Sequence, residues 1–204
     1  MKYFEITDKL DSEFHPAVPR GTNIKTPGGC KECSTIPKDG RPPAVLKVTE
    51  IPSPVSPVSF TTWGFGVIAI EFMELLGDDA TACLRLGKLA LADGRIVEGF
   101  RTFVGVERII LRGSEESEHR ICKSCGAMIY TYVPRDAPYV TTTQVTSRRA
   151  IYEAESMVLL VDDRIRDCIG NRWSDRIVFY EVPVRDSPRD GLPARLDLWP
   201  SQEI

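Results

Sequence analysis

Two pairs of cysteines, each with two residues between its members, are the part of this chain best suited to chemistry. Cys30 and Cys33 form one pair, in Cys-Lys-Glu-Cys, and Cys122 and Cys125 form the other, in Cys-Lys-Ser-Cys-Gly. A C-x-x-C turn directs two thiolates at one ion, and two such turns complete a tetrahedral zinc site. The two pairs therefore predict one zinc ion held by four sulfurs, in a closed site of the kind that is usually structural.

The separation of the two pairs along the chain is unusual for such a site. There are 88 residues between Cys33 and Cys122, whereas compact zinc ribbons have their two turns much closer together. One ion shared by zinc knuckles at 30–33 and 122–126 would clamp the N-terminal segment to the middle of the chain. Zinc bound by cysteines contributes about 10 kcal/mol or more of apparent folding free energy. Three alternatives stay open: unrelated pairs of thiols, a former site without metal, or a redox function.

The remaining cysteines and histidines carry weaker signals. Cys83 and Cys168 have apolar neighbours at helical or strand spacing, so we expect small buried hydrophobic side chains there. His119 lies three residues before Cys122 and is an alternative ligand in place of one cysteine. The chain lacks the serine-hydrolase elbow, the P-loop and the His-Glu-x-x-His motif. Because no catalytic constellation is recognisable, we expect a protein that is not an enzyme.

Composition and charge limit the classes of partner. The chain has 204 residues, 42% of them hydrophobic, so it can bury a core of domain size. Its formal net charge of −3 offers no overall basic surface for nucleic acid. The first residues lack the apolar run of a signal peptide, and no stretch has the roughly 20 apolar residues of a membrane span. We therefore expect a cytoplasmic protein with reduced cysteines and no membrane contact.

Two stretches with the pattern of a strand followed by a helix organise the rest of the chain. In the first, residues 67–76 carry apolar side chains on one helical face and end at Gly77. In the second, a buried strand at 157–161 leads into a helix that Asp162 caps and Gly170 ends. The second phrase follows the first after 93 residues, which suggests two halves of one α+β body.

Other segments complete the expected fold. Further strands are predicted at 2–6, 96–111, 127–133 and 175–184. Six prolines between 37 and 57 exclude a helix or a central strand, so we expect an irregular surface connection there. Residues 186–204 form a tail that docks loosely. Together these patterns predict a single α+β domain over 1–204, with mixed sheets, two strand–helix units and a zinc-ribbon-like pair of C-x-x-C knuckles.

The knuckle at 122–126, the phrase at 163–185 and the opening Met1–Glu5 are similar to segments of the myxobacterial double-CxxCG paralogue family. That family is regarded as the immunity half of toxin–immunity pairs in swarm inhibition, in which kin cells deliver a toxin and a cytoplasmic protein neutralises it. The resemblance implies the same four metal ligands: Cys30, Cys33, Cys122 and Cys125. Ser34 stands where the family has a glycine, so the first knuckle departs from the family pattern.

The resemblance implies an immunity protein that binds and neutralises a cognate toxin. A cluster of acidic residues is a candidate surface for a basic toxin, since opposite charges speed association: Glu115, Glu116 and Glu118. The alternative from another class is a zinc-ribbon module that binds nucleic acid. It would need a basic stripe near Arg148–Arg149 or Lys25–Lys31, with binding that weakens steeply in salt. A degenerate enzyme would instead show a deep pocket lined by polar groups.

Overall fold

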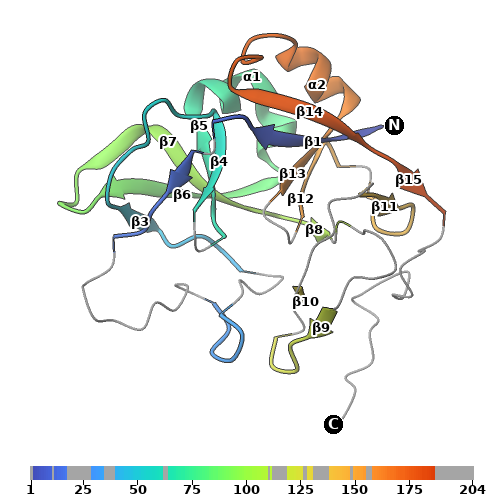
Figure 1. The fold of residues 1–204 in the computed structure, drawn as a ribbon, viewed down its shortest axis with the longest axis horizontal. Helices are drawn as coiled ribbons and strands as arrows, with labels where there is room; N and C mark the ends of the chain where they lie inside the picture. Colours follow the sequence, from blue (N-terminus) through green and yellow to red (C-terminus); the bar gives the residue numbers. More distant parts are fainter. Residues whose placement is uncertain are drawn as a thin grey trace.

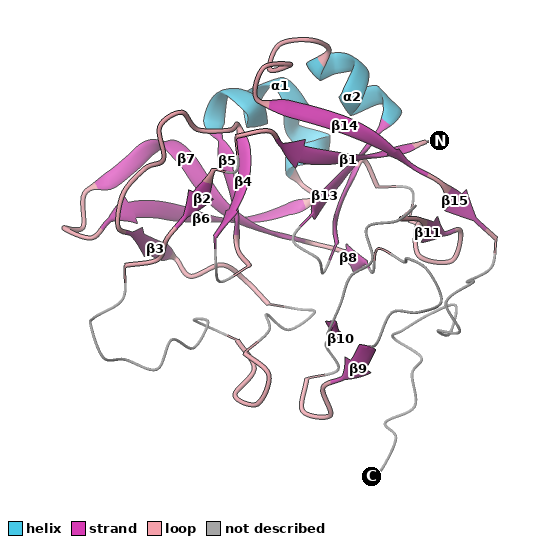
Figure 2. Ribbon diagram, viewed as in Figure 1, coloured by secondary structure: helices cyan, strands magenta, loops and turns pink. Residues whose placement is uncertain are grey.

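The computed structural model describes residues 2–10, 12–17, 29–34, 40–61, 64–109, 111, 119–125, 128–130, 138–147, 149–154 and 158–186. Over this part of the chain the protein is a mixed α+β fold with two large sheets, two small two-stranded sheets and two helices (Figures 1 and 2). Both helices lie at the top of Figure 1, and the short hairpin of β9 and β10 lies at the opposite end.

The large sheets contain strands from distant parts of the sequence. One has the order β14-β1-β13-β12-β8, and the other has the order β2-β4-β5-β7-β6-β3. The bounds in the first are Ile177–Val182 (β14), Tyr3–Asp8 (β1), Val158–Asp162 (β13), Ile151–Ala154 (β12) and Arg108–Ile109 (β8). Those in the second are Glu13–Phe14 (β2), Val58–Thr61 (β4), Gly66–Ala69 (β5), Ile96–Gly105 (β7), Leu84–Leu91 (β6) and Val45–Val48 (β3). The small sheets pair β9 (His119–Ile121) with β10 (Met128–Tyr130) and β11 (Val140–Thr141) with β15 (Val184–Arg185).

The register of the strands shows that the two large sheets are copies of one another. In the six-stranded sheet, β4 and β5 are antiparallel and Val58 lies opposite Ile68. In the five-stranded sheet, β12 and β13 are antiparallel and Ile151 lies opposite Val161. Both partners have moved by the same 93 positions, from 58 to 151 and from 68 to 161. The two strand pairs therefore have the same register.

The other half of each sheet repeats with a second, constant offset. Leu84 of β6 lies opposite Gly105 of β7, and Ile177 of β14, 93 positions after Leu84, lies opposite Asp8 of β1, 97 positions before Gly105. Even the parallel edge pairs agree. β2 lies parallel to β4, as β8 lies parallel to β12, and β3 lies parallel to β6, as β11 lies parallel to β15.

The chain is thus an internal duplication. We call Tyr3–Leu91 repeat 1 and Ile96–Arg185 repeat 2. The equivalent elements are β1 and β7, β2 and β8, β3 and β11, β4 and β12, β5 and β13, the helices α1 and α2, and β6 with β14 and β15. The first strand of each repeat lies in the sheet of the other: β1 sits between β13 and β14, and β7 sits between β5 and β6. This exchange ties the two repeats together through backbone hydrogen bonds.

The helices follow equivalent strands and end at equivalent glycines. Helix α1 (Ile70–Thr81) is interrupted at Gly77, whose φ of 76° leaves the helical region. Helix α2 (Asp163–Ile169) ends at Gly170, with a φ of 53°. Glycine adopts such positive φ values without the steric penalty that a Cβ imposes. The two glycines are therefore the helix ends that the sequence pattern predicts, although a further turn follows Gly77.

Hydrophobic packing has the same two-fold arrangement. A central core takes equivalent residues from both repeats: Val58 and Ile151, Ile68 and Val161, Phe72 and Ile165, Leu84 and Ile177. An outer core backs the six-stranded sheet, and its counterpart backs the five-stranded sheet, again with equivalent members: Phe14 and Ile109, Val48 and Val140, Val67 and Leu160, Leu89 and Val182. Full burial of such a side chain contributes roughly 1.5–3 kcal/mol. The central core therefore stabilises the contact between the repeats as well as each repeat.

Two sequence expectations need correction. The proline-rich stretch is not irregular throughout, because β3 pairs with β6 and buries Leu46 and Val48. On its other side β3 bonds to residues 15–17, with Ala17 donating to Lys47 and Thr49 donating to His15. The prolines flank Val45–Val48 and lie outside it, so they remove no donor from the strand. Cys168 is exposed and was expected to be buried, whereas Cys83 is buried as predicted. The prediction for the tail concerns residues that lie outside the described part of the chain, apart from Asp186.

Candidate metal centre

Two turns from equivalent places in the two repeats bring four thiols together. The sulfurs of Cys30, Cys33, Cys122 and Cys125 all lie within 4.8 Å of one another. The Sγ atoms of Cys30 and Cys122 are 3.7 Å apart, and those of Cys33 and Cys125 are 3.6 Å apart. Each of these contacts joins residues 92 positions apart, first cysteine to first and second to second. The four residues that the sequence singles out therefore converge on one site.

The spacing of the sulfurs matches what a tetrahedral metal ion requires. A zinc–sulfur bond of about 2.3 Å places the corners of a regular tetrahedron about 3.8 Å apart. The two contacts between repeats lie close to that value, and both are far longer than a disulfide bond of about 2.05 Å. All six cysteines of the chain are free thiols. The donor set and its geometry fit a four-coordinate metal ion.

The first knuckle holds its two sulfurs by a backbone turn. The N–H of Ser34 donates to the carbonyl oxygen of Cys30 at 2.8 Å, which closes the turn around Lys31 and Glu32. Ser34 itself has a φ of 61°, in the left-handed region. A residue with a Cβ is disfavoured there by about 1–2 kcal/mol. Ser34 thus holds a conformation that glycine adopts without a steric penalty, at a cost in strain.

The second knuckle is held by a small hairpin. Strands β9 and β10 are antiparallel, with Ile121 opposite Met128, so the turn at Cys122–Cys125 forms the tip between them. The sequence predicts a longer strand over 127–133, of which β10 is the described part. The structure of Gly126 lies outside the described residues. The pairing of these strands places the turn with its two sulfurs at the end of the hairpin.

Backbone donors and burial act in opposite directions on two equivalent thiols. The N–H groups of Cys33 and Glu32 donate to the Cys30 sulfur and lower the pKa of its thiol to about 6. Burial raises the pKa of the Cys122 thiol. The two residues are similarly enclosed, with exposed fractions of 8% and 6%. The N–H groups of a knuckle stabilise a thiolate, which is the form of cysteine that binds a metal.

Charged side chains surround the sulfurs. The Glu32 carboxylate lies 3.9 Å from the Cys122 sulfur, so the first turn reaches over the second. Four thiolates around a divalent ion carry a net charge of −2. Lys31 and Lys123 occupy the same position in the two turns, and both are exposed. The two lysines add one positive charge to each knuckle.

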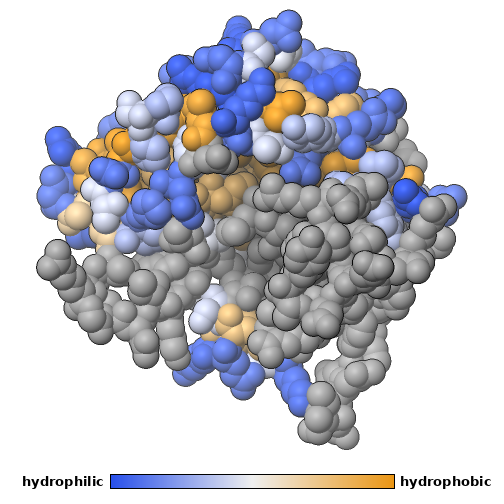
Figure 3. All heavy atoms as spheres, in the orientation of Figure 1, coloured by the Kyte–Doolittle hydropathy of each residue, from blue (hydrophilic) through white to orange (hydrophobic). Residues whose placement is uncertain are grey.

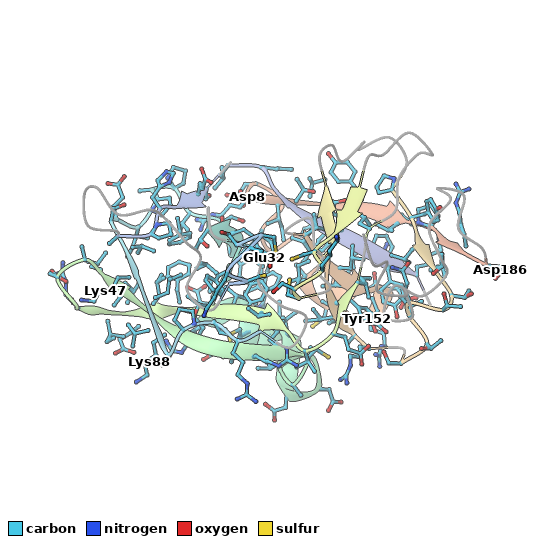
Figure 4. The ribbon with its side chains drawn as sticks, turned by 90° about the horizontal axis from the view of Figure 1, so that it is seen from below. Asp8, Glu32, Lys47, Lys88, Tyr152 and Asp186 are labelled. Atoms are coloured by element: carbon cyan, nitrogen blue, oxygen red, sulfur yellow. The ribbon has the colours of Figure 1, made fainter. Side chains whose placement is uncertain are left out.

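The centre lies where equivalent parts of the repeats meet. At one end of the molecule, the cysteines of the two turns contact one another. At the other end, the thiol of Cys168 in α2 donates to the carbonyl oxygen of Leu75 in α1, and these two residues are equivalent at the spacing of 93. Seen from below, Glu32 lies between the side that carries Lys47 and Lys88 and the side that carries Tyr152 (Figure 4). Hydrophilic side chains cover much of the helical end, with hydrophobic ones between them (Figure 3). An ion at the cysteines would thus join the repeats near their local two-fold axis.

Several other sequence candidates are placed elsewhere or lie outside the described residues. The Arg149 guanidinium forms an ion pair with Glu107. Its charge is therefore compensated within the protein, which disfavours the predicted basic stripe for nucleic acid at this residue. Only the backbone of His119 is described, in β9, and the prediction for its side chain lies outside what the structure describes. The acidic cluster around Glu115 and the basic residues Lys25 and Arg148 also lie outside it. A network of Ser147, Tyr152 and Arg149 around Glu107 is not apparent from the sequence. No motif marks it.

Comparison of the chain with protein-family models and with curated proteins finds no match. The resemblance to double-CxxCG sequences therefore rests on the motifs quoted above. Within the described residues, neither helix has the length and apolar character needed to cross a membrane.

Proposed function

We propose that the protein is a non-catalytic immunity protein in the cytoplasm, built around a structural zinc ion, that binds a cognate toxin and covers its active surface. The observation that carries the metal half is the convergence of the four sulfurs from two repeats. The toxin half rests on the similarity of the knuckle at 122–126, the phrase at 163–185 and the opening residues to double-CxxCG sequences.

The proposed ion has a definite mechanical role. The knuckles lie at the end of the molecule away from α1 and α2, beyond the extensive cores of the sheets. Four metal–sulfur bonds would join repeat 1 to repeat 2 there. A rigid surface binds a partner with a smaller loss of conformational entropy than a loose one. Zinc would therefore contribute to toxin binding by ordering this end, and it would take no part in a reaction.

Metal analysis of two equivalent variants tests the first half. We expect one zinc per chain in the wild-type protein and none in Cys30→Ser/Cys33→Ser or in Cys122→Ser/Cys125→Ser, because either repeat alone supplies two ligands. Cys168→Ser removes an exposed thiol outside the site and should keep the metal. Inductively coupled plasma mass spectrometry after purification without added zinc measures this. Full zinc retention in either double variant would rule out the shared site.

Co-expression with the candidate toxin encoded beside this gene tests the second half. We expect survival of the host cells and a complex that elutes as one species in size-exclusion chromatography. Killing that continues at equal expression, together with separate elution, would contradict neutralisation by binding. Binding to RNA or DNA that falls steeply with salt would favour the zinc-ribbon alternative instead.

A further inference from the structure

The two-fold relation of the repeats brings equivalent sulfurs of the metal centre into contact. Cys30 lies 3.7 Å from Cys122 and Cys33 lies 3.6 Å from Cys125, so the first and second cysteines of one turn face their equivalents in the other. These two contacts cross between repeats, and all four sulfurs lie within 4.8 Å of one another. In a redox protein with a single C-x-x-C motif, by contrast, the disulfide forms within the motif.

We propose that the cysteine centre is also an oxidation site, at which a peroxide converts the four thiols into two disulfides between the repeats, Cys30–Cys122 and Cys33–Cys125. The proposal rests on the proposed zinc site only for the ion that would be released. The sulfur contacts that define the pairing join side chains of this chain alone.

The chemistry balances with hydrogen peroxide as the oxidant. A thiolate attacks one peroxide oxygen, the O–O bond breaks, and a sulfenic acid and water form once a proton is taken up. The facing thiol then attacks the sulfenic sulfur, forming the S–S bond and releasing a second water. Each pair transfers two electrons to one peroxide. For the zinc-bound site, two peroxides and four protons yield two disulfides, free Zn²⁺ and four waters.

The pairing decides what oxidation does to the molecule. Disulfides within the turns would leave the two knuckles as separate loops once the ion is gone. Disulfides between the repeats keep the same four sulfurs joined across the same junction. Oxidation would then replace the metal–sulfur bonds between the repeats by disulfide bonds. The ion would be released, and the two repeats would stay linked.

Tryptic digestion followed by mass spectrometry identifies the disulfide pairing directly, because a lysine lies between the cysteines of each turn. Cleavage after Lys31 puts Cys30 on peptide 26–31 and Cys33 on peptide 32–38. Cleavage after Lys123 puts Cys122 on peptide 121–123 and Cys125 on peptide 124–135. Each cysteine of the centre therefore has a peptide of its own, and a disulfide joins two identifiable masses.

The experiment uses full-length Cys168→Ser protein, so that the exposed thiol cannot exchange. The protein is stripped with a chelator under reducing conditions, freed of reductant, oxidised with hydrogen peroxide, and digested without reduction. We expect an intact mass lower by about 4 Da, the loss of four hydrogens. The major linked peptides should be 26–31 with 121–123 and 32–38 with 124–135. Links of 26–31 to 32–38, or of 121–123 to 124–135, as the major products would overturn the proposal.

A second variant keeps the test decisive if scrambling occurs during digestion. In Cys33→Ser/Cys168→Ser, we expect the link between 26–31 and 121–123 to persist while Cys125 stays alkylatable. A Cys122–Cys125 disulfide as the major product in this variant would contradict the pairing. Zinc content of the untreated sample is measured in parallel. A protein without zinc that still forms the cross-repeat links would refute the zinc half of the proposed function and leave the oxidation site standing.

Discussion

Repeat 1 and repeat 2 share the register of their strands and differ in nearly every side chain. At the constant spacing of 93 residues, positions 50–92 and 143–185 hold the same residue type only at Gly77 and Gly170. The pairings of β4 with β5 and of β12 with β13 are nevertheless in step. What persists between the repeats is apolar character at buried positions and a glycine at the helix ends. A core tolerates exchange of its side chains as long as total volume and pattern are kept.

One pair of positions shows how volume is redistributed. In the six-stranded sheet, Gly66 lies opposite Phe103, and a Cβ on the glycine would lie only 2.1 Å from the aromatic ring. In the five-stranded sheet, the equivalent pair is Leu159 opposite Ile6. A large and an absent side chain in one sheet thus correspond to two branched side chains of middle size in the other. The same space is filled in two ways.

Transplanting this pair should have the largest effect. We expect Gly66→Leu to lower the free energy of unfolding by about 3 kcal/mol or more, because the new side chain overlaps the Phe103 ring. Adding Phe103→Ile should recover at least about 1 kcal/mol, because it reproduces the leucine–isoleucine pair of the five-stranded sheet. Urea denaturation followed by circular dichroism measures both. Gly99→Ala, where no atom lies within 4 Å of the new Cβ, is the matched control. Purely additive losses in the double variant would contradict the equivalence.

The N-termini of the helices offer a second contrast. Asp162 caps α2 by accepting from the N–H of Ile165, whereas the equivalent Ala69 of α1 has no side-chain cap. We expect Asp162→Ala to lower the free energy of unfolding by about 2 kcal/mol, since the cap is buried. We expect Ala69→Asp to raise it by about 0.5 kcal/mol. Thermal and urea unfolding should show opposite signs, and equal signs would mean that the two helix starts are not interchangeable.

The first cysteines of the two turns should differ in reactivity. In metal-free protein at pH 7, we expect iodoacetamide to modify Cys30 roughly five- to tenfold faster than Cys122, because the lowered pKa populates the Cys30 thiolate. The rate at Cys30 should fall as the pH drops through about 6, where that thiolate takes up a proton. Mass spectrometry of tryptic peptides 26–31 and 121–123 gives the two rates. Faster labelling of Cys122 at neutral pH would reverse the assignment.

The smallest expected effect concerns the residue after the first knuckle. Ser34 has a positive φ, and repeat 2 has Gly126 at the corresponding place in the sequence. We expect Ser34→Gly to stabilise the folded protein by about 0.5–1 kcal/mol, because relief of strain exceeds the entropy that glycine adds to the unfolded chain. Ser34→Ala keeps a Cβ and should give no such gain. Competition with a chromophoric chelator should show slightly tighter zinc binding for the glycine variant alone.

Local features were readable from the sequence because they depend on residues only a few positions apart. The C-x-x-C turns, the Asp162 cap and the glycines at 77 and 170 each act within one turn of backbone, and the structure contains all of them. The α+β class with mixed sheets followed from the same local patterns. The sequence shows a strand–helix pattern that recurs after 93 residues, but it does not show that the other strands are duplicated as well.

Only the tertiary structure decided which distant segments meet. The placement of β1 between β13 and β14, and of β7 between β5 and β6, depends on hydrogen bonds whose partners are far apart in sequence. Backbone pairing does not require particular side chains. Only one of 43 positions spaced by 93 residues holds the same residue type, so the duplication is not visible when the two sequences are aligned at that spacing. The four sulfurs converge from residues 92 positions apart, which no local pattern determines. The cysteines supply the chemistry, and the tertiary structure brings them to one point.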